Sequence, residues 1–217
     1  MHSMLIIGAG KFGHHLAENL CAMGNDVMLV DKNEPKIEEY SSNVTNAEIG
    51  DYTVKANLEA LGVDDYDYVF VCVGDFQDSL VITSYLKELG ARCVISKASS
   101  LIHEKFLLQN GADRVVYPER DTAYSMAVSY SSSTIYDYFK LSEDTGIYEI
   151  EPPSKWIGKS LSQIDVRKTH SVNVIAYRAG GKISSISSPD YIFKSNEHII
   201  VMGEYENIKK ITKDKWY

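Results

Sequence analysis

The part of the sequence that most constrains the fold is its first thirty residues. A short apolar run over residues 4–7 is followed at once by the glycine pattern GAGKFG of residues 8–13. Residues 11–23 have a helical pattern, and residues 26–31 form a second apolar run that ends in a carboxylate. Strand, G-x-G-x-x-G, helix, strand and acid in this order are typical of a dinucleotide-binding unit. We therefore predict an adenosine-type ligand here, over the alternative of a unit that keeps the fold and binds nothing.

Each glycine of this pattern has a physical role. Gly8 allows a sharp turn, Gly10 lets a phosphate approach the backbone, and Gly13 lets the helix pack close to the strand. The unpaired N–H groups at the N-terminus of the helix favour an anion. Asp31, at the end of the second apolar run, is placed to accept hydrogen bonds from ribose hydroxyls.

Short apolar runs alternate with helical patterns down to about residue 118. The runs cover residues 5–7, 27–30, 44–49, 68–73, 93–95 and 114–116. The helical stretches between them end at Gly24, Gly62, Gly90 and Gly111, and glycine is a common stop signal. Buried runs that alternate with helices predict a parallel sheet covered on both faces. We predict an α/β fold over residues 1–118, a Rossmann-like doubly wound parallel sheet of about six strands.

A different pattern begins after this sheet. Residues 119–141 are predicted to form a long linking helix, because they lack a strand pattern. This stretch carries several apolar and aromatic side chains, namely Met126, Val128, Tyr130, Ile135, Tyr138 and Phe139. Exposed surface of this kind usually meets another domain or another copy of the chain.

The remaining segment, residues 142–217, is predicted to be a small α+β module. Strands are expected at residues 147–150, 172–177, 182–186 and 198–202, and short helices at 161–164 and 204–211. Gly180 and Gly181 lie between two of these strands and indicate a hairpin.

Composition excludes several classes of protein. The net charge of −8 and the lack of a basic cluster argue against nucleic acid as a partner. No apolar run approaches the roughly 20 residues that cross a membrane, and residues 4–7 are too short for a signal peptide. Cys21, Cys72 and Cys93 are well separated, so we expect buried free thiols in a reducing cytoplasm.

The sequence shows a nucleotide site without visible chemistry beside it. Tyr136 and Lys140 have the spacing of a dehydrogenase Tyr/Lys pair, but the glycine spacing of the first loop does not fit those enzymes. His14 and His15 are adjacent and are expected to point about 100° apart on a helix, so they should not chelate a metal ion as an i, i+4 pair would. We therefore predict a sensor with no catalytic residues.

The chain resembles, from end to end, the RCK (regulator of conductance of potassium) proteins, and looks like the cytosolic regulatory subunit of bacterial Ktr/Trk potassium uptake systems. The resemblance is carried by GAGKFG at 8–13, Asp31, Gly50-Asp51, VCVG at 71–74, GADRVVYPE at 111–119 and IIVMG at 199–203. The segment GADRVVYPE before a predicted helix is the most specific of these, since a dehydrogenase has no reason to carry it.

The resemblance implies a cytoplasmic protein at the inner face of the cell membrane, bound to a membrane potassium channel subunit. It implies a homo-octameric ring whose paired subunits bind ATP or ADP at a hinged interface. The implied nucleotide-binding residues are Gly8, Gly10, Lys11, Phe12, Gly13, Asp31, Lys32, Asp51, Val73, Gly74 and Lys97. Among them, Asp31 would hold the ribose and the residues from Gly10 to Gly13 would surround the phosphates.

Two charged positions have alternative interpretations. Lys11 matches a basic residue that reaches the terminal phosphate across the dimer, where Arg is the expected type; a solvated lysine at a helix start is the alternative. Glu119 matches a carboxylate that binds Mg²⁺ or Ca²⁺ between paired ATP sites, because a divalent cation relieves the repulsion between phosphates and carboxylates. The alternative is a first-turn acid that the helix dipole favours.

The C-terminal module resembles a domain that dimerises around cyclic di-AMP in related proteins. The matching positions are Leu161, Asp165, Val166, Arg167, Asn173, Val174 and Pro189. Arg167 is suited to pair with phosphate, and the apolar residues to pack against adenine. The alternative is that these apolar residues are core and Arg167 is a surface residue.

Two rival functions remain open from the sequence. The same glycine pattern binds NAD, so an NAD(H)-binding redox sensor or an oxidoreductase is one alternative. The lack of a substrate domain argues against the enzyme. A nucleotide-binding adaptor unrelated to ion transport is the other.

Overall fold

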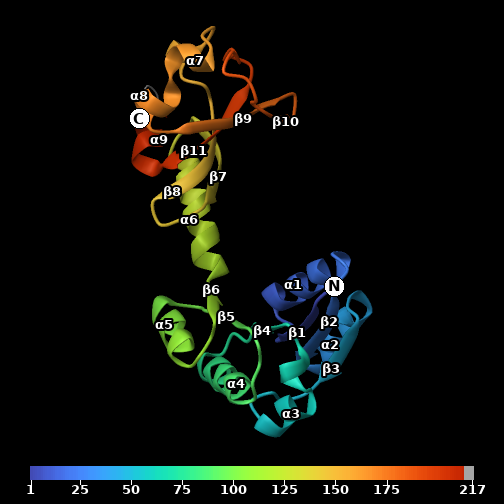
Figure 1. Cartoon of the computed structure of the whole chain (residues 1–217). Coiled ribbons are helices and arrows are strands. Elements are labelled where there is room, and N and C mark those ends of the chain that lie inside the picture. The colour runs from blue at the N-terminus through green and yellow to red at the C-terminus, as the bar shows by residue number, and fades with distance from the viewer. Residues whose placement is uncertain (213–217) are drawn as a thin grey trace. The chain divides into compact units, whose positions relative to one another are not determined.

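The computed structural model describes residues 1–212 and divides the chain into two compact units, Met1–Glu119 and Arg120–Tyr217. Figure 1 traces both. The last five residues of the predicted C-terminal module, 213–217, lie outside the described residues.

The first unit is built on a six-stranded sheet in the order β3-β2-β1-β4-β5-β6, and all its pairs are parallel. The strands are β1 (Ser3–Ile7), β2 (Asp26–Asp31), β3 (Asn46–Ile49), β4 (Tyr68–Val71), β5 (Val94–Lys97) and β6 (Arg114–Val116). The prediction of a doubly wound parallel sheet is confirmed. The strand order reverses between β1 and β4, because the chain runs from β1 through β2 to β3 at one edge and then returns to place β4 on the other side of β1.

Helices cover both faces of this sheet (Figure 1). They are α1 (Lys11–Ala22), α2 (Glu34–Tyr40), α3 (Lys55–Ala60), α4 (Phe76–Glu88) and α5 (Leu101–Gln109). Successive residues of a strand point to opposite faces. Accordingly Leu5 belongs to the core that includes Leu58 of α3 and Leu86 of α4, whereas Ile6 belongs to the core that includes Ala17 of α1 and Ile37 of α2.

The second unit contains a five-stranded antiparallel sheet in the order β10-β9-β11-β8-β7. Its strands are β7 (Ile135–Lys140), β8 (Thr145–Ile150), β9 (Asn173–Ala179), β10 (Lys182–Ser185) and β11 (His198–Glu204). Its helices after β8 are α7 (Leu161–Ile164), α8 (Val166–His170) and α9 (Tyr205–Thr212). The predicted hairpin at Gly180-Gly181 is confirmed, since both glycines have positive φ and connect β9 to β10. Helix α8 was not predicted.

The predicted long helix over residues 119–141 is wrong in its second half. Helix α6 (Pro118–Tyr130) ends after Tyr130, and the chain continues as β7. The buried residues of β7 are Ile135 and Tyr138, a spacing of three that mimics a helix. A β-bulge between Ile135 and Asp137 produces this spacing, because an extra residue in a strand shifts which side chains face the core. A local alternation test therefore misses this strand.

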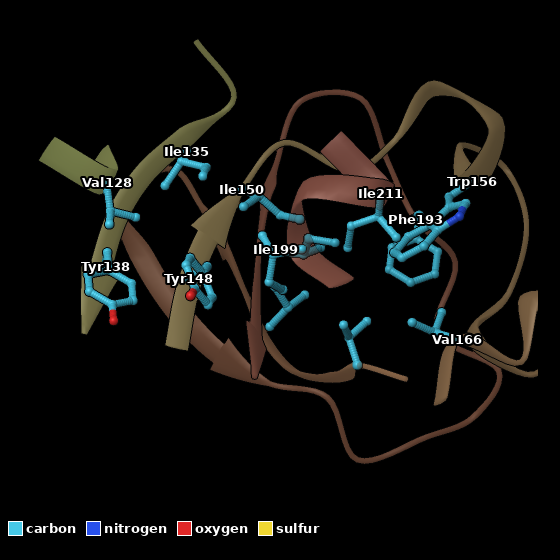
Figure 2. Packing of buried hydrophobic residues seen from close by; sticks show 13 residues of the cluster. Val128, Ile135, Tyr138, Tyr148, Ile150, Trp156, Val166, Phe193, Ile199 and Ile211 are labelled. Carbon is cyan, nitrogen blue, oxygen red and sulfur yellow. The ribbon is translucent and has the colours of Figure 1, made fainter. Parts of the chain in front are cut away.

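The core of the second unit is assembled from distant parts of its sequence. Figure 2 shows Val128 of α6, Tyr138 of β7 and Ile199 of β11 within one cluster that extends to Trp156 and Phe193. The rings of Trp156 and Phe193 lie 5.3 Å apart between centroids. Helix α6 thus contributes Val128, near its C-terminal end, to the core of the second unit.

The structure also bears on the thiols and on membrane insertion. Cys21, Cys72 and Cys93 are free cysteines, as predicted, but only Cys72 is fully buried. Burial raises the pKa of the Cys72 thiol to about 12. None of the helices within residues 1–212 has both the length and the apolar character that crossing a membrane requires.

Replacing Ile199 by alanine is expected to destabilise the second unit. Ile199 is fully buried between β8 and β9, and a buried Ile→Ala change costs about 2–5 kcal/mol of unfolding free energy. Ile183→Ala is the control, since Ile183 is 54% exposed and should change stability by less than about 0.5 kcal/mol. Urea unfolding measures both, and equal effects would contradict this assignment of the core.

Candidate functional site

A pocket of about 220 Å³ opens at the carboxyl ends of the parallel strands of the first unit. Ile7 at the end of β1 and Asp31 at the end of β2 line it, together with Cys72, which directly follows β4. This is the place where the strand order reverses, and open α/β sheets bind their ligands at such points. The fold alone therefore marks this pocket as the candidate site.

Seven of the predicted nucleotide-binding residues line the pocket, namely Gly8, Gly10, Asp31, Lys32, Asp51, Val73 and Gly74. Five other polar or aromatic residues that were not predicted also line it, namely Lys36, Tyr52, Thr53, Asp75 and Asp78. These five follow the ends of β2, β3 and β4. Their position after predicted parallel strands is the signal that would have found them.

The glycines of the first loop fall into two physical groups. A Cβ on Gly13 would lie 1.9 Å from the carbonyl oxygen of Gly8, and Gly8 itself has a φ of +108°. Both must be glycine for α1 to start where it does. A Cβ on Gly10 would meet no atom of the described chain within 4 Å, so the protein's own packing does not require glycine there. A ligand that approached the Gly10 backbone closely would require glycine there instead.

Asp31 connects the glycine loop to the end of β2. Its Oδ2 accepts a hydrogen bond from the backbone N–H of Ala9 at 2.7 Å, and its Oδ1 accepts from Asn33 N at 2.8 Å. Lys36 Nζ lies 3.6 Å from Oδ2. A carboxylate has about four acceptor positions, so Asp31 retains capacity for hydroxyl donors after these contacts. It is both a structural clamp and a candidate hydroxyl acceptor.

Acidic groups dominate the rest of the pocket. Asp51 accepts from the backbone N–H and the hydroxyl of Thr53, and these bonds lower the pKa of the Asp51 carboxyl. Lys32 Nζ donates to Asp78 Oδ2 at 3.0 Å, and this contact raises the pKa of Lys32. Ionised carboxylates accept hydrogen bonds from hydroxyls but repel phosphates. This side of the pocket therefore suits a ribose and not a phosphate chain.

The N-terminus of α1 offers the complementary environment. Gly10 caps α1 without a side chain, and within the described structure neither a side-chain cap nor an acid occupies its first turn. Exposed Lys11 adds a positive charge at the same end. By contrast, the N-terminus of α4 is capped by Asp75, which accepts from Asp78 N. Unpaired N–H groups and the helix dipole make the start of α1 the place for an anion.

A second polar cluster of the first unit is the Lys97–Glu119 pair, which lies near the ring of Phe12. Lys97 Nζ donates to Glu119 Oε1 at 2.7 Å and lies 6.0 Å from the centroid of the Phe12 ring. The hydrogen bond from Lys97 lowers the pKa of the Glu119 carboxyl. Lys97 is largely buried, with 18% of its side chain exposed, whereas Glu119 is 62% exposed. The cluster thus holds an accessible, ionised carboxylate on a largely buried lysine.

The residues predicted for a second ligand lie in the C-terminal unit, and the structure brings some of them together. Exposed Arg167 donates to Asn173 Oδ1 at 2.6 Å. The carbonyl of exposed Pro189 accepts from Ser162 N, next to Leu161. The remaining three have visible structural roles. Val166 belongs to the core, Val174 packs against it, and Asp165 takes a left-handed φ of 50° between α7 and α8.

Comparisons with known proteins fit this architecture. The TrkA-N domain model matches residues 4–118, and the TrkA-C domain model matches residues 146–214. The chain is 34% identical to Ktr system potassium uptake protein C of Bacillus subtilis strain 168, over 96% of this chain and 95% of that protein. It is 33% identical to Ktr system potassium uptake protein A of the same strain, over 94% and 93%. The chain belongs to the TrkA-N/TrkA-C (RCK) family of Ktr and Trk potassium uptake proteins.

Solved structures confirm the fold of this family member. The GsuK channel bound to NAD superposes with a TM-score of 0.71 at 14% identity, over 97% of this chain and 39% of that one. GsuK bound to ADP superposes with a TM-score of 0.53 at 17% identity, over 60% and 35%. The chain therefore spans well under half the length of these two GsuK chains.

Gly13 and Gly10, two glycines of the same loop, should differ in how much stability their replacement by alanine costs. Gly13→Ala forces a Cβ against the Gly8 carbonyl, and overpacking of this kind costs about 1–3 kcal/mol or more of stability. Gly10→Ala meets open space and should cost no more than about 1 kcal/mol, the preference for glycine over alanine at the N-cap of α1. Thermal unfolding of both variants without ligand measures this difference. An unfolding midpoint for Gly13→Ala equal to that of the original chain would contradict the close approach.

Proposed function

We propose that this chain is a nucleotide-sensing, non-catalytic gating subunit of a bacterial potassium uptake system. The observation that carries the proposal is the pocket at the point where the strand order of the sheet reverses. The chain that holds it is 34% identical to a Ktr potassium uptake protein, over 95% of that protein's length. The acids at the ends of β2 and β3 and the uncapped start of α1 divide this site into a hydroxyl side and a phosphate side.

The ligand is proposed to be ATP or ADP. The ribose hydroxyls would donate to Asp31, with Asp51 near the adenosine, and Val73 and Gly74 would pass under the ligand. The phosphates would lie against the N–H groups of the first turn of α1, beside Lys11. The absence of a Cβ clash at Gly10 and Gly74 within the described chain supports close approach of a ligand there.

NAD(H) is the alternative ligand. A structural neighbour, the GsuK channel, was solved with NAD and also with ADP, and the glycine loop suits either diphosphate. NAD(H) binding would make the chain a redox sensor rather than an energy sensor. Turnover of a substrate would be needed to make it an oxidoreductase.

A divalent cation, Mg²⁺ or Ca²⁺, is proposed to act at Glu119. The exposed carboxylate is an oxygen ligand of the type that these ions prefer. In the structure the ammonium group of Lys97 neutralises the Glu119 carboxylate, with Nζ 2.7 Å from Oε1. A nucleotide phosphate would compete with Glu119 for Lys97, and a cation would then replace the lost positive charge. The site would be completed by a second subunit.

The proposed partners are a membrane potassium channel subunit and further copies of this chain in an octameric ring. The proposed location is the cytoplasmic face of the cell membrane. Nucleotides would act by shifting a conformational equilibrium of the ring, which a ligand can do only through different affinities for its two states.

Cyclic di-AMP is proposed as a second ligand, of the C-terminal unit. The hydrogen bond from Arg167 to Asn173 supports this, because it orients an exposed guanidinium that can pair with a phosphate. Asp165, Val166 and Val174 would contribute mainly through the backbone turn and the core packing that position Arg167 and Asn173.

Thermal unfolding with a panel of ligands tests the proposal. A ligand that binds only the native state stabilises it by about 2.7 kcal/mol at a hundred times its Kd. We expect ATP and ADP to raise the midpoint, cyclic di-AMP to act separately, and the effect of ATP to grow with Mg²⁺ or Ca²⁺. Stabilisation by NADH without any effect of ATP would favour the redox sensor instead. Co-purification with a membrane channel subunit would distinguish a gating subunit from an unrelated adaptor.

Asp31→Asn should weaken nucleotide binding while the unit stays folded. Asparagine keeps one acceptor oxygen, which can bond the buried Ala9 N–H, while its amide nitrogen faces the N–H of exposed Asn33. Alanine would instead leave the Ala9 group unpaired at a cost of about 1–3 kcal/mol. A hydrogen bond to a charged group contributes about 1.5–3 kcal/mol, so we expect at least a tenfold rise in Kd by calorimetry. Asp64→Asn, at an exposed acid outside the pocket, is the control. Unchanged affinity in Asp31→Asn would remove Asp31 from the ligand site.

Glu119→Gln should abolish the cation-dependent part of ATP stabilisation. The amide keeps the shape of the side chain but loses the negative charge that holds a divalent ion. Without ligand, the variant should be within about 1 kcal/mol of the original chain, because the amide oxygen can still accept from Lys97 and the substituted side chain is 62% exposed. The matched control is Glu88→Gln, which breaks the Lys55–Glu88 pair of the same 2.7 Å length. An identical cation response in both variants would exclude Glu119 from the site.

A further inference from the structure

A cluster of metal-ligating side chains lies on α1, apart from the residues that line the nucleotide pocket. One ligand atom each of His14, His15 and Glu18 lies within 4.8 Å of the others. The two imidazole rings were expected to diverge, but their centroids are only 4.0 Å apart. Glu18 reaches both rings because it follows His14 by four residues and His15 by three, the spacings that face each other on a helix.

The hydrogen bonds around His14 leave one ring nitrogen available. His14 Nδ1 lies 3.0 Å from the carbonyl oxygen of Gly10. A carbonyl can only accept, so Nδ1 carries the proton and Nε2 keeps its lone pair. Tyr40 stacks on the ring with centroids 4.1 Å apart and the planes at 7°. His14 is 8% exposed, so its ring is held in one orientation before any ion arrives.

Glu18 is oriented in the same manner. Asn43 Nδ2 donates to Glu18 Oε1 at 2.7 Å, and the other oxygen, Oε2, lies 3.6 Å from His15 Nδ1. A carboxylate with one oxygen bound to an amide presents the other to a cation. Metal-binding histidines and carboxylates characteristically have such outer hydrogen bonds, which fix the ligands and raise their affinity.

We propose that His14, His15 and Glu18 form a binding site for a divalent transition-metal ion of the Zn²⁺ class. Imidazole nitrogen favours Zn²⁺, Cu²⁺ and Ni²⁺ over Mg²⁺ and Ca²⁺. Two imidazoles and one carboxylate leave a fourth tetrahedral position for water or another ligand. Ligand atoms around Zn²⁺ lie about 3.3 Å apart at bond lengths of about 2.0–2.1 Å, and rotation of the exposed His15 ring closes the remaining distance.

The site does not depend on the proposed function, although it is connected to the nucleotide loop. Gly10, whose carbonyl bonds His14, is both the N-cap of α1 and part of the pocket lining. An ion on His14 would strengthen the bond from Nδ1 to this carbonyl. The metal site and the glycine loop therefore share one fixed backbone group.

Calorimetric titration of the intact, tag-free chain with Zn²⁺, after treatment with a chelator and without nucleotide, tests the site. We expect one tight site per chain. His15→Gln and Glu18→Gln should each raise the Kd at least about tenfold, because loss of outer partners alone costs about 10–100-fold. Asn43→Ala should also weaken binding without changing the number of sites. Glu34→Gln removes an exposed acid elsewhere and should leave the Kd within about twofold.

Two results would overturn the site. One is a Zn²⁺ affinity that is the same in the original chain, His15→Gln and Glu18→Gln. The other is an equal loss in Glu34→Gln, which would indicate non-specific attraction to an acidic surface. Co²⁺ provides a readout of geometry, since coordination by these ligands should produce visible absorption in the original chain and in Glu34→Gln but not in His15→Gln. Because nucleotide is absent, failure here leaves the proposed nucleotide function untouched.

Discussion

The close approach of Gly13 to the Gly8 carbonyl is the constraint on which the first unit depends. A Cβ at Gly13 would stand 1.9 Å from that oxygen, so α1 packs on β1 only because both residues are glycine. This contact directs the N-terminus of α1 to the carboxyl edge of the sheet. Asp31 then ties the same loop to β2 through the Ala9 N–H at 2.7 Å. Fold and binding site are therefore one arrangement of the same backbone atoms.

Charge is divided within the unit in a way that suits a nucleotide. The described pocket lining includes four aspartates and two lysines. This excess of carboxylates favours hydroxyl donors over phosphates. The start of α1, with Lys11, offers the positive environment, and Lys97 of the Lys97–Glu119 pair lies near Phe12 of the same helix. The proposed Zn²⁺-class site uses imidazoles further along the same helix. One helix thus connects two chemically distinct sites through Gly10.

Local pattern predicted some elements well and others not, for identifiable reasons. The central strands β1, β2 and β4 are predictable because they are continuous apolar runs with buried residues on both faces of the sheet. The pattern of residues 135–140 predicts a helix and not strand β7, because the bulge of this strand spaces the buried residues Ile135 and Tyr138 by three positions. Of the five missed pocket residues, Lys36 and Asp78 lie in α2 and α4, and the other three lie in the loops after β3 and β4. Apart from their position after predicted strands, no local pattern in the sequence marks them as pocket residues.

The sequence by itself determined the order of strands and helices in the first unit, the glycine loop and the membership in a family, because these depend on short-range periodicity and on residues without a Cβ. Only the tertiary structure decided which side chains converge. It showed that Asp31 already bonds two backbone groups, that Lys97 reaches Glu119, and that His14, His15 and Glu18 gather on α1. This convergence depends on side-chain rotamers and on partners from other segments, such as Asn43 and Tyr40. Neither can be predicted from the spacing of residues along α1.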